Sequence, residues 1–256
     1  MGQPTTGVVD GRLALPGIVL LSGIVGSTAY GLAGPESDID RLGVYAAPTA
    51  ALHGLRLPLG KDATRVTASP DGAYHEALKY AGLALSANPT AAELMWLPDN
   101  LYEVRTPLGD ELIGIRTAFL SARRVRGAYL GYATQQFREL ETRGDGSFSS
   151  DTRKRTSKHA RHLARLIDQG VHLYGTGELT IRLEHPQQYR DFGDRVAAGA
   201  VDEARERLAM AERAFDSGPC ALPERPDEAR VQAWLRKVRA TPAHLSVDGA
   251  THIFLG

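Results

Sequence analysis

Cysteine is almost absent from this 256-residue chain, which contains only Cys220. A single cysteine has no partner for an intramolecular disulfide, and this fits a reducing cytoplasm. No run of eighteen apolar residues occurs, and the stretch MGQPTTGVVDGRLALPG lacks a basic segment that leads into an apolar one. We therefore expect neither a membrane span nor a secretory signal.

An excess of charge of one sign is also missing, since 30 basic residues balance 30 acidic residues. Zero net charge argues against a protein that coats nucleic acid non-specifically, although a local basic patch is compatible with it. Hydrophobic residues make up 43% of the chain, enough to bury a sizeable core in one large or two modest domains. The composition fits a soluble cytoplasmic enzyme without identifying one.

Several common phosphate-binding and hydrolase motifs are absent as well. No Gly-Lys-Ser or Gly-Lys-Thr occurs, so a P-loop is unsupported. The glycines at 23, 26 and 31 lack the spacing of the dinucleotide-binding fingerprint, and no Gly-x-Ser-x-Gly elbow is present. Chemistry on a phosphate would therefore need a different motif.

The segment GSTAYGLAGPESDID, residues 26–40, is the most informative part of the chain. It follows IVLLSGIV, residues 18–25, a short apolar run rich in β-branched side chains that predicts a buried strand. From Ser27 the pattern is helical until Gly34-Pro35 ends it. Gly26 would let a phosphate approach the backbone, and Ser27 would open a helix whose free N–H groups attract anions.

Two carboxylates, Asp38 and Asp40, close this segment. Ile39 alternates with them and Leu42-Gly43-Val44-Tyr45 follows, which fits a second strand whose polar positions share one face. Residues i and i+2 of a strand lie roughly 6.5–7 Å apart, and such a pair of carboxylates can hold two Mg²⁺ ions about 3.5–4 Å apart. An isolated Ser-Asp-x-Asp would be a solvated turn with an Asx cap. Its spacing from Gly26-Ser27, after a buried strand, favours a metal site.

Gly-Ser, a ten-residue gap and Asp-Ile-Asp resemble the signature of the DNA polymerase beta-type nucleotidyltransferase superfamily. The longer string GSTAYGLAGPESDIDRLGVY resembles a bacterial and phage branch of predicted nucleotidyltransferases, some of which are associated with RNA ligases. That branch also tends to show an Asp eight residues before a helix Lys, and then Asn-Pro-Thr and Glu-Leu. Asp71, Lys79, Asn88-Pro89-Thr90 and Glu93-Leu94 match these landmarks, and the resemblance extends over roughly residues 18–200.

The resemblance implies a magnesium-dependent transfer of a nucleoside monophosphate from an NTP to a hydroxyl, with release of pyrophosphate. Asp38 and Asp40 would bind two Mg²⁺ ions, which Mn²⁺ could replace, and Asp71 would complete the catalytic metal site. Ser69-Pro70-Asp71-Gly72 reads locally as a turn, so Asp62 and Glu76 remain reserve candidates for the third carboxylate. Lys79 is either a phosphate contact, as the resemblance implies, or a surface helix residue.

A basic patch lies in RKRTSKHARHLAR, residues 153–165. Read as a helix, it places Lys154, Lys158, Arg161 and Arg165 on one stripe, opposite an apolar face. Lys158 with Arg161 or His162 could reach the triphosphate, or the stripe could follow an RNA backbone, or it could be an ordinary solvated face. A metal site at His159 and His162 is disfavoured, because no acid or third histidine is near in sequence.

The fold class expected is α+β, with a mixed, helix-flanked sheet in a nucleotidyltransferase domain over residues 1–105. Residues 106–256 would form a helical domain that closes one wall of the active-site cleft. Periodicity predicts helices over residues 73–86, from Thr90 onward (with Glu93 at a capping-box position), and over 109–117, 121–142, 151–174, 187–197, 201–217 and 227–239. The glycine-rich residues 143–150 would be a flexible connector.

An RNA or tRNA end is the first choice of acceptor, because relatives accompany RNA ligases and the basic stripe could follow a phosphate backbone. A small molecule such as an aminoglycoside, or a protein hydroxyl, is the alternative for an enzyme. The remaining alternative is a nucleotide-binding regulator or toxin-antitoxin component without turnover. Nothing in the sequence assigns a base preference or an oligomeric state.

Overall fold

The computed structural model describes residues 17–35, 37–55, 57–68, 71–142 and 150–241. Five strands form one sheet in the order β3-β4-β2-β1-β5. Strands β2 and β4 are parallel, whereas all other neighbours are antiparallel. The strands are β1 (Ile18–Ile24), β2 (Arg41–Ala46), β3 (Thr64–Ala68), β4 (Asp71–Glu76) and β5 (Tyr102–Arg105). The expected α+β class with a mixed sheet is confirmed.

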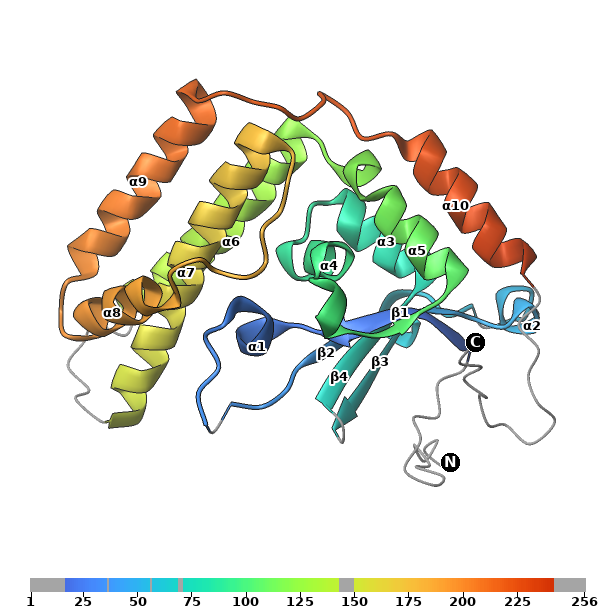
Figure 1. Ribbon diagram of the computed structural model, residues 1–256, viewed down its shortest axis with the longest axis horizontal. Coiled ribbons are helices and arrows are strands. Elements are labelled where there is room, and N and C mark those ends of the chain that lie inside the picture. Colours follow the sequence, from blue (N-terminus) through green and yellow to red (C-terminus); the bar gives the residue numbers. More distant parts are fainter. Residues whose placement is uncertain (1–16, 36, 56, 69–70, 143–149, 242–256) are drawn as a thin grey trace.

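Helices cover one face of this sheet and build a bundle beside it (Figure 1). The helices nearer the sheet are α1 (Gly26–Tyr30), α2 (Thr49–Leu52), α3 (Ala77–Leu85), α4 (Pro89–Glu93), α5 (Pro107–Gly114) and α10 (Glu228–Ala240). The bundle contains α6 (Ala122–Thr142), α7 (Ser150–Thr176), α8 (Pro186–Ala197) and α9 (Val201–Ser217). Short 3-10 helices are η1 (Gly60–Ala63), η2 (Leu94–Trp96), η3 (Asp99–Leu101) and η4 (Arg116–Phe119).

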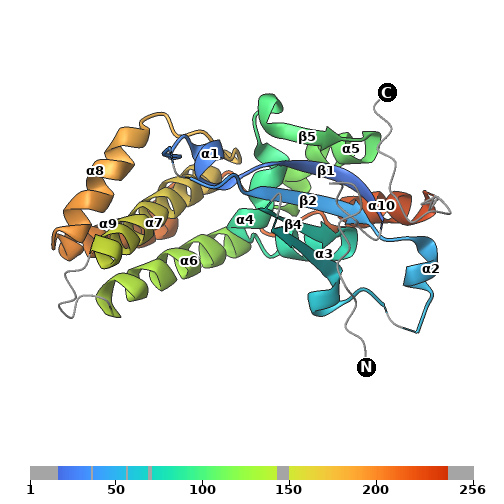
Figure 2. The ribbon, with the colours of Figure 1, turned by 90° about the horizontal axis from the view of Figure 1, so that it is seen from below.

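The main apolar core is continuous from the sheet into the bundle. It joins Leu21 and Val44 of the sheet to Leu163 of α7 and Phe215 of α9. Helix α10 follows the bundle in sequence but packs against α3 and α5 (Figures 1 and 2). The end of the described chain therefore returns to the sheet. None of the described helices combines the length and apolarity that a membrane span requires.

The five predicted helices from residue 121 to residue 239 are confirmed to within about two residues at each end. The predicted helix over residues 73–86 is wrong at its start, because residues 73–76 continue strand β4. The helix begins at Ala77, where the side chain of Glu76 accepts a hydrogen bond from the backbone N–H of Leu78 at 2.8 Å. Most of the predicted connector, residues 143–149, lies outside the described residues.

Helix α4 starts where Asn88-Pro89 predicts, but Glu93 does not complete a capping box. The side chain of Asn88 caps the helix by accepting from the N–H of Ala91 at 3.0 Å. Glu93 instead points into the protein interior, where it is 1% exposed. Its partners there belong to the candidate site.

Candidate active site

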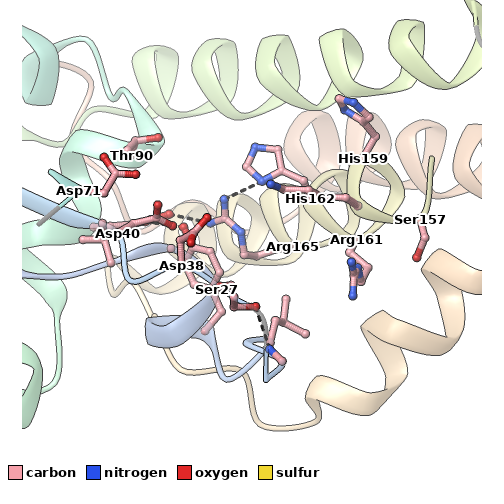
Figure 3. Close-up of a pocket in the computed structure, with 18 of the residues that line it drawn as sticks. Ser27, Asp38, Asp40, Asp71, Thr90, Ser157, His159, Arg161, His162 and Arg165 are labelled. Atoms are coloured by element: carbon pink, nitrogen blue, oxygen red, sulfur yellow. Dashed lines mark hydrogen bonds and ion pairs between the residues drawn. The ribbon is translucent and has the colours of Figure 1, made fainter. Parts of the chain in front are cut away.

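A cavity of about 1560 Å³ opens between one edge of the sheet and the bundle. Asp38, Asp40 and Asp71 line it from the loops and strand ends at the sheet, and most of the basic residues come from α7 and α8. Figure 3 shows the three aspartates on the sheet side and Arg161 and His162 on α7. Arg41 of β2, Glu93 of α4 and Asp194 of α8 also line the cavity. Small-molecule pockets usually measure about 300–1,000 Å³. This cavity therefore has room for a nucleotide together with part of a second substrate.

Asp40 and Asp71 are brought together by the pairing of two strands that are distant in sequence. Strand β2 pairs with β4 in parallel, with Arg41 opposite Gly72. The residues immediately before these, Asp40 and Asp71, therefore lie side by side at the same edge of the sheet. Asp38 acts on Asp40 as well, and all three carboxylates line the cavity (Figure 3).

The prediction that Asp38 and Asp40 belong to a strand is wrong. Strand β2 begins only at Arg41, and both acids lie in the loop that precedes it. Asp40 is held by its backbone carbonyl, which accepts a hydrogen bond from the N–H of Val25 at 2.9 Å. A hydrogen bond from the residue that follows β1 therefore positions Asp40, and membership in strand β2 does not.

The neighbouring carboxylates repel one another. Burial, the charge of Asp71 and the charge of Asp38 raise the pKa of Asp40, while Lys158 opposes them. Among the described residues no group of three or more His, Cys, Asp or Glu side chains is gathered closely enough to hold a metal ion. The donor type nevertheless fits a hard divalent cation, since carboxylate oxygens are its preferred ligands and its charge would relieve the repulsion among Asp38, Asp40 and Asp71.

Gly26 lies directly against Asp40 and needs to be glycine. Its φ is +67°, in the left-handed region, and a Cβ at this position would collide with Oδ2 of Asp40. The helix that follows ends at Tyr30, because Gly31 adopts a φ of +79°. It is therefore shorter than the helix predicted up to Gly34. Both Gly26 and Ser27 line the cavity.

Helix α7 supplies the basic wall of the cavity. Lys158 is exposed, while Arg161 and His162 are half-buried, and all three line the cavity. Burial lowers the pKa of Arg161; the nearby Arg190 adds to this effect and Asp194 opposes it. His159 bonds through Nδ1 to Oε1 of Gln136 at 2.7 Å, on the side toward α6.

Arg165 does not continue the exposed stripe, so that part of the prediction is wrong. Its side chain is 2% exposed, and its Nη1 donates to Oε1 of Glu93 at 2.6 Å. The hydroxyl of Tyr30 donates to the other Glu93 oxygen at 2.6 Å, and the Arg165 guanidinium lies 4.0 Å from the centre of the Tyr30 ring. This buried cluster joins α7 of the bundle to α1 and α4 beside the sheet.

Lys79 does not line the cavity, contrary to the phosphate contact considered for it. Its Nζ donates to the carbonyl of Gly60 at 2.8 Å and to Oγ1 of Thr64. The reserve candidates for the third carboxylate also lie elsewhere. Glu76 is buried and bonds to Nη1 of Arg239 at 2.5 Å, and Asp62 belongs to η1.

Helix α8 adds two cavity residues that the sequence analysis missed. Arg190 donates from Nη2 to the carbonyl of Gly31 at 3.1 Å, and Asp194 accepts from Oγ of Ser157 at 3.0 Å. Gly193 between them allows α8 to approach α7 closely, because a Cβ there would press on Ser157 and Arg161. Sequence periodicity predicted this helix, but no local signal indicates which of its faces meets the cavity.

Comparison with protein families finds one match that covers most of the chain. Residues 15–211 match the family RlaP, described as the RNA repair pathway DNA polymerase beta family. A search of curated proteins finds no match.

Proposed function

Because the chain belongs to the RNA repair pathway DNA polymerase beta family, we propose that it transfers a nucleoside monophosphate from an NTP to an acceptor hydroxyl. Pyrophosphate is the second product. The observation that carries the proposal is the opposition of two charged walls across one cavity. Asp38, Asp40 and Asp71 lie on the sheet side, as Figure 3 shows. Lys158 and Arg161 of α7 line the same cavity, and the charge of Lys158 acts on Asp40.

Asp38 and Asp40 would hold two Mg²⁺ ions, and Asp71 would complete the catalytic metal site. Divalent ions bound there supply charge neutralisation and Lewis-acid activation to phosphoryl chemistry. Membership in a DNA polymerase beta family supports the use of a divalent metal. The raised pKa of Asp40 supports this assignment, because it reflects repulsion from neighbouring carboxylates that a bound cation would offset.

The other cavity residues would bind and align the triphosphate. Gly26 permits close approach of a phosphate to the backbone, and Ser27 lies beside it. Lys158, Arg161 and His162 would contact phosphate oxygens from the opposite wall. Positioning and preorganised charge would account for most of the rate enhancement, since little covalent chemistry is required of the protein.

The acceptor proposed is the hydroxyl of an RNA or tRNA end. The cavity exceeds the needs of a nucleotide alone, and the exposed Arg153 and Lys154 extend its basic wall by one turn of α7. Membership in an RNA repair family favours the same substrate class. In this proposal residues 1–105 carry the catalytic acids, and residues 106–256 supply the basic wall that closes the cleft.

Incubation with labelled NTPs and Mg²⁺ or Mn²⁺, followed by separation of RNA, protein and small metabolites, tests the reaction and the acceptor. We expect label in RNA and release of pyrophosphate. Label in metabolites or protein would contradict the RNA acceptor. Nucleotide binding without pyrophosphate release would contradict the transferase and indicate a regulator.

Asp40→Ala should reduce transfer to below about a hundredth of the wild-type rate without unfolding the protein, because the lost charge stabilisation is worth several kcal/mol. Lys79→Ala is the matched control, since this charged residue lies outside the cavity. A larger residual rate for Asp40→Ala would refute the metal-binding role.

A further inference from the structure

His162 is held by a partner that can only donate hydrogen bonds. Its Nδ1 lies 3.0 Å from Nη2 of Arg165. A guanidinium has five N–H donors and no acceptor, and it stays protonated in proteins. Nδ1 of His162 must therefore be the acceptor in this pair, which means that it carries no proton.

Further hydrogen bonds hold the guanidinium of Arg165 in its orientation toward the imidazole. Its Nη1 donates to Glu93 and to Oε1 of Gln169, both at 2.6 Å. Gln169 is itself oriented, because its Nε2 donates to the carbonyl of Thr180 at 2.9 Å. The cluster is buried, and α4, α7 and the segment after α7 all contribute to it. The tautomer of His162 is thus set by the packed interior.

The imidazole is also kept neutral by its surroundings. Burial lowers the pKa of His162 to about 3, and the positive charges of Arg165 and Lys158 and the proximity of His159 act in the same direction. A neutral ring without a proton on Nδ1 carries its proton on Nε2. Among the described residues Nε2 has no hydrogen-bond partner, and the side chain lines the cavity.

We propose that His162 carries its proton on Nε2 and presents this N–H to a phosphate oxygen of the bound nucleotide. The inference rests on the proposed function, because it takes the ligand of the cavity to be an NTP. Phosphate is the expected acceptor, since Lys158 and Arg161 of the same helix line the cavity beside it. In this role His162 is neither a general base nor a source of positive charge.

Nuclear magnetic resonance of protein labelled with ¹⁵N-histidine tests the tautomer without any nucleotide. The signal of His162 is assigned from its absence in the His162→Gln variant. We expect long-range ¹H–¹⁵N correlations of the Nε2–H tautomer, unchanged from pH 8 to pH 5. A proton on Nδ1, or a titration midpoint above pH 5, would overturn the inference.

Two variants test the donor role. The side-chain nitrogen of Gln lies as many bonds from Cα as Nε2 of histidine, whereas that of Asn corresponds to Nδ1. His162→Asn can still accept from Arg165 through Oδ1, but its nitrogen ends one bond short of the position of Nε2. We expect it to weaken NTP binding about tenfold or more in calorimetry, and His162→Gln to recover most of that loss.

Inorganic tripolyphosphate with Mg²⁺ separates phosphate contacts from contacts to sugar or base. His162→Asn should weaken tripolyphosphate and NTP binding by similar factors. An effect on NTP alone, or equal binding by the Asn and Gln variants, would overturn the phosphate assignment. Failure of wild-type protein to bind NTP would refute the proposed function and the donor role together, while the tautomer would still be decided by the spectrum.

Discussion

The buried Arg165–Glu93 pair provides the sharpest test of how the two halves of the molecule are joined. The two side chains are 2% and 1% exposed, and both Glu93 oxygens are hydrogen-bonded, one to Arg165 and one to Tyr30. Glu93→Gln keeps the volume but removes the negative charge. It also turns an amide N–H₂ toward one of these two donors.

Breaking a buried ion pair by neutralising one partner lowers the free energy of unfolding by about 3–5 kcal/mol. Arg165 retains Gln169 and His162 as neutral acceptors, and the ring of Tyr30 beneath it. We therefore expect Glu93→Gln to lower the free energy of unfolding by about 3 kcal/mol, near the lower end of this range. Urea denaturation at pH 7 measures this, provided that the m-value is unchanged.

The control is Asp216→Asn, which breaks the exposed pair between Arg126 and Asp216. Its side chains are 42% and 56% exposed, so the loss should stay below about 1 kcal/mol. In the double variant Glu93→Gln/Arg165→Met no unpaired charge is left, and we expect higher stability than the sum of the single effects predicts. A loss below about 1 kcal/mol for Glu93→Gln, or strict additivity in the double variant, would refute this account of the cluster.

Four further perturbations test the cavity and its frame. Gly26→Ala should cost about 1–2 kcal/mol of stability, because of its positive φ, and should slow labelled-NTP transfer by displacing Asp40; an unchanged rate would contradict the close packing. The raised pKa of Asp40 means that Mg²⁺ affinity should fall, as pH is lowered, at a pH above its ordinary value of 3.8. Asp71→Asn removes a repelling charge, so calorimetry with Mg²⁺ should place the midpoint of this loss at lower pH than in wild type; a shift to higher pH would contradict the pairing. Lys79→Ala should leave NTP affinity unchanged, whereas a tenfold loss of affinity would show that this lysine contacts the nucleotide. Asn88→Ala should lower the free energy of unfolding by about 0.5–2 kcal/mol, because the α4 cap is lost. No change in thermal denaturation would show that the cap is dispensable.

Without metal, these carboxylates should also make the free energy of unfolding depend on pH. A carboxyl whose pKa is raised on folding contributes stability that is present below its ordinary pKa and lost as pH rises through the raised value. Metal-free protein should therefore gain stability at neutral pH when Asp71 is changed to Asn, and added Mg²⁺ should stabilise wild-type protein more than the variant. Differential scanning calorimetry with and without Mg²⁺ measures both effects.

The sequence by itself determined the features that depend on neighbouring residues. An apolar run ended by Gly26 predicted β1, and a repeat near 3.6 residues predicted the long helices α6, α7, α9 and α10. The spacing of Gly26-Ser27 and Asp38-Ile39-Asp40 indicated the family. Each of these signals is local, because main-chain geometry fixes the periodicity of a helix and the residues that end it.

Only the tertiary structure decided which distant residues meet. Local patterns do not predict the short strands β3 and β5, and over β4 they predict a turn and the start of a helix, because sheet pairing outweighs local propensity. Parallel pairing of β2 with β4 placed Asp71 beside Asp40, and packing of α7 on α4 buried Arg165 against Glu93. Burial and charge pairing depend on the element that covers a face, and a chain read in one dimension does not contain that information.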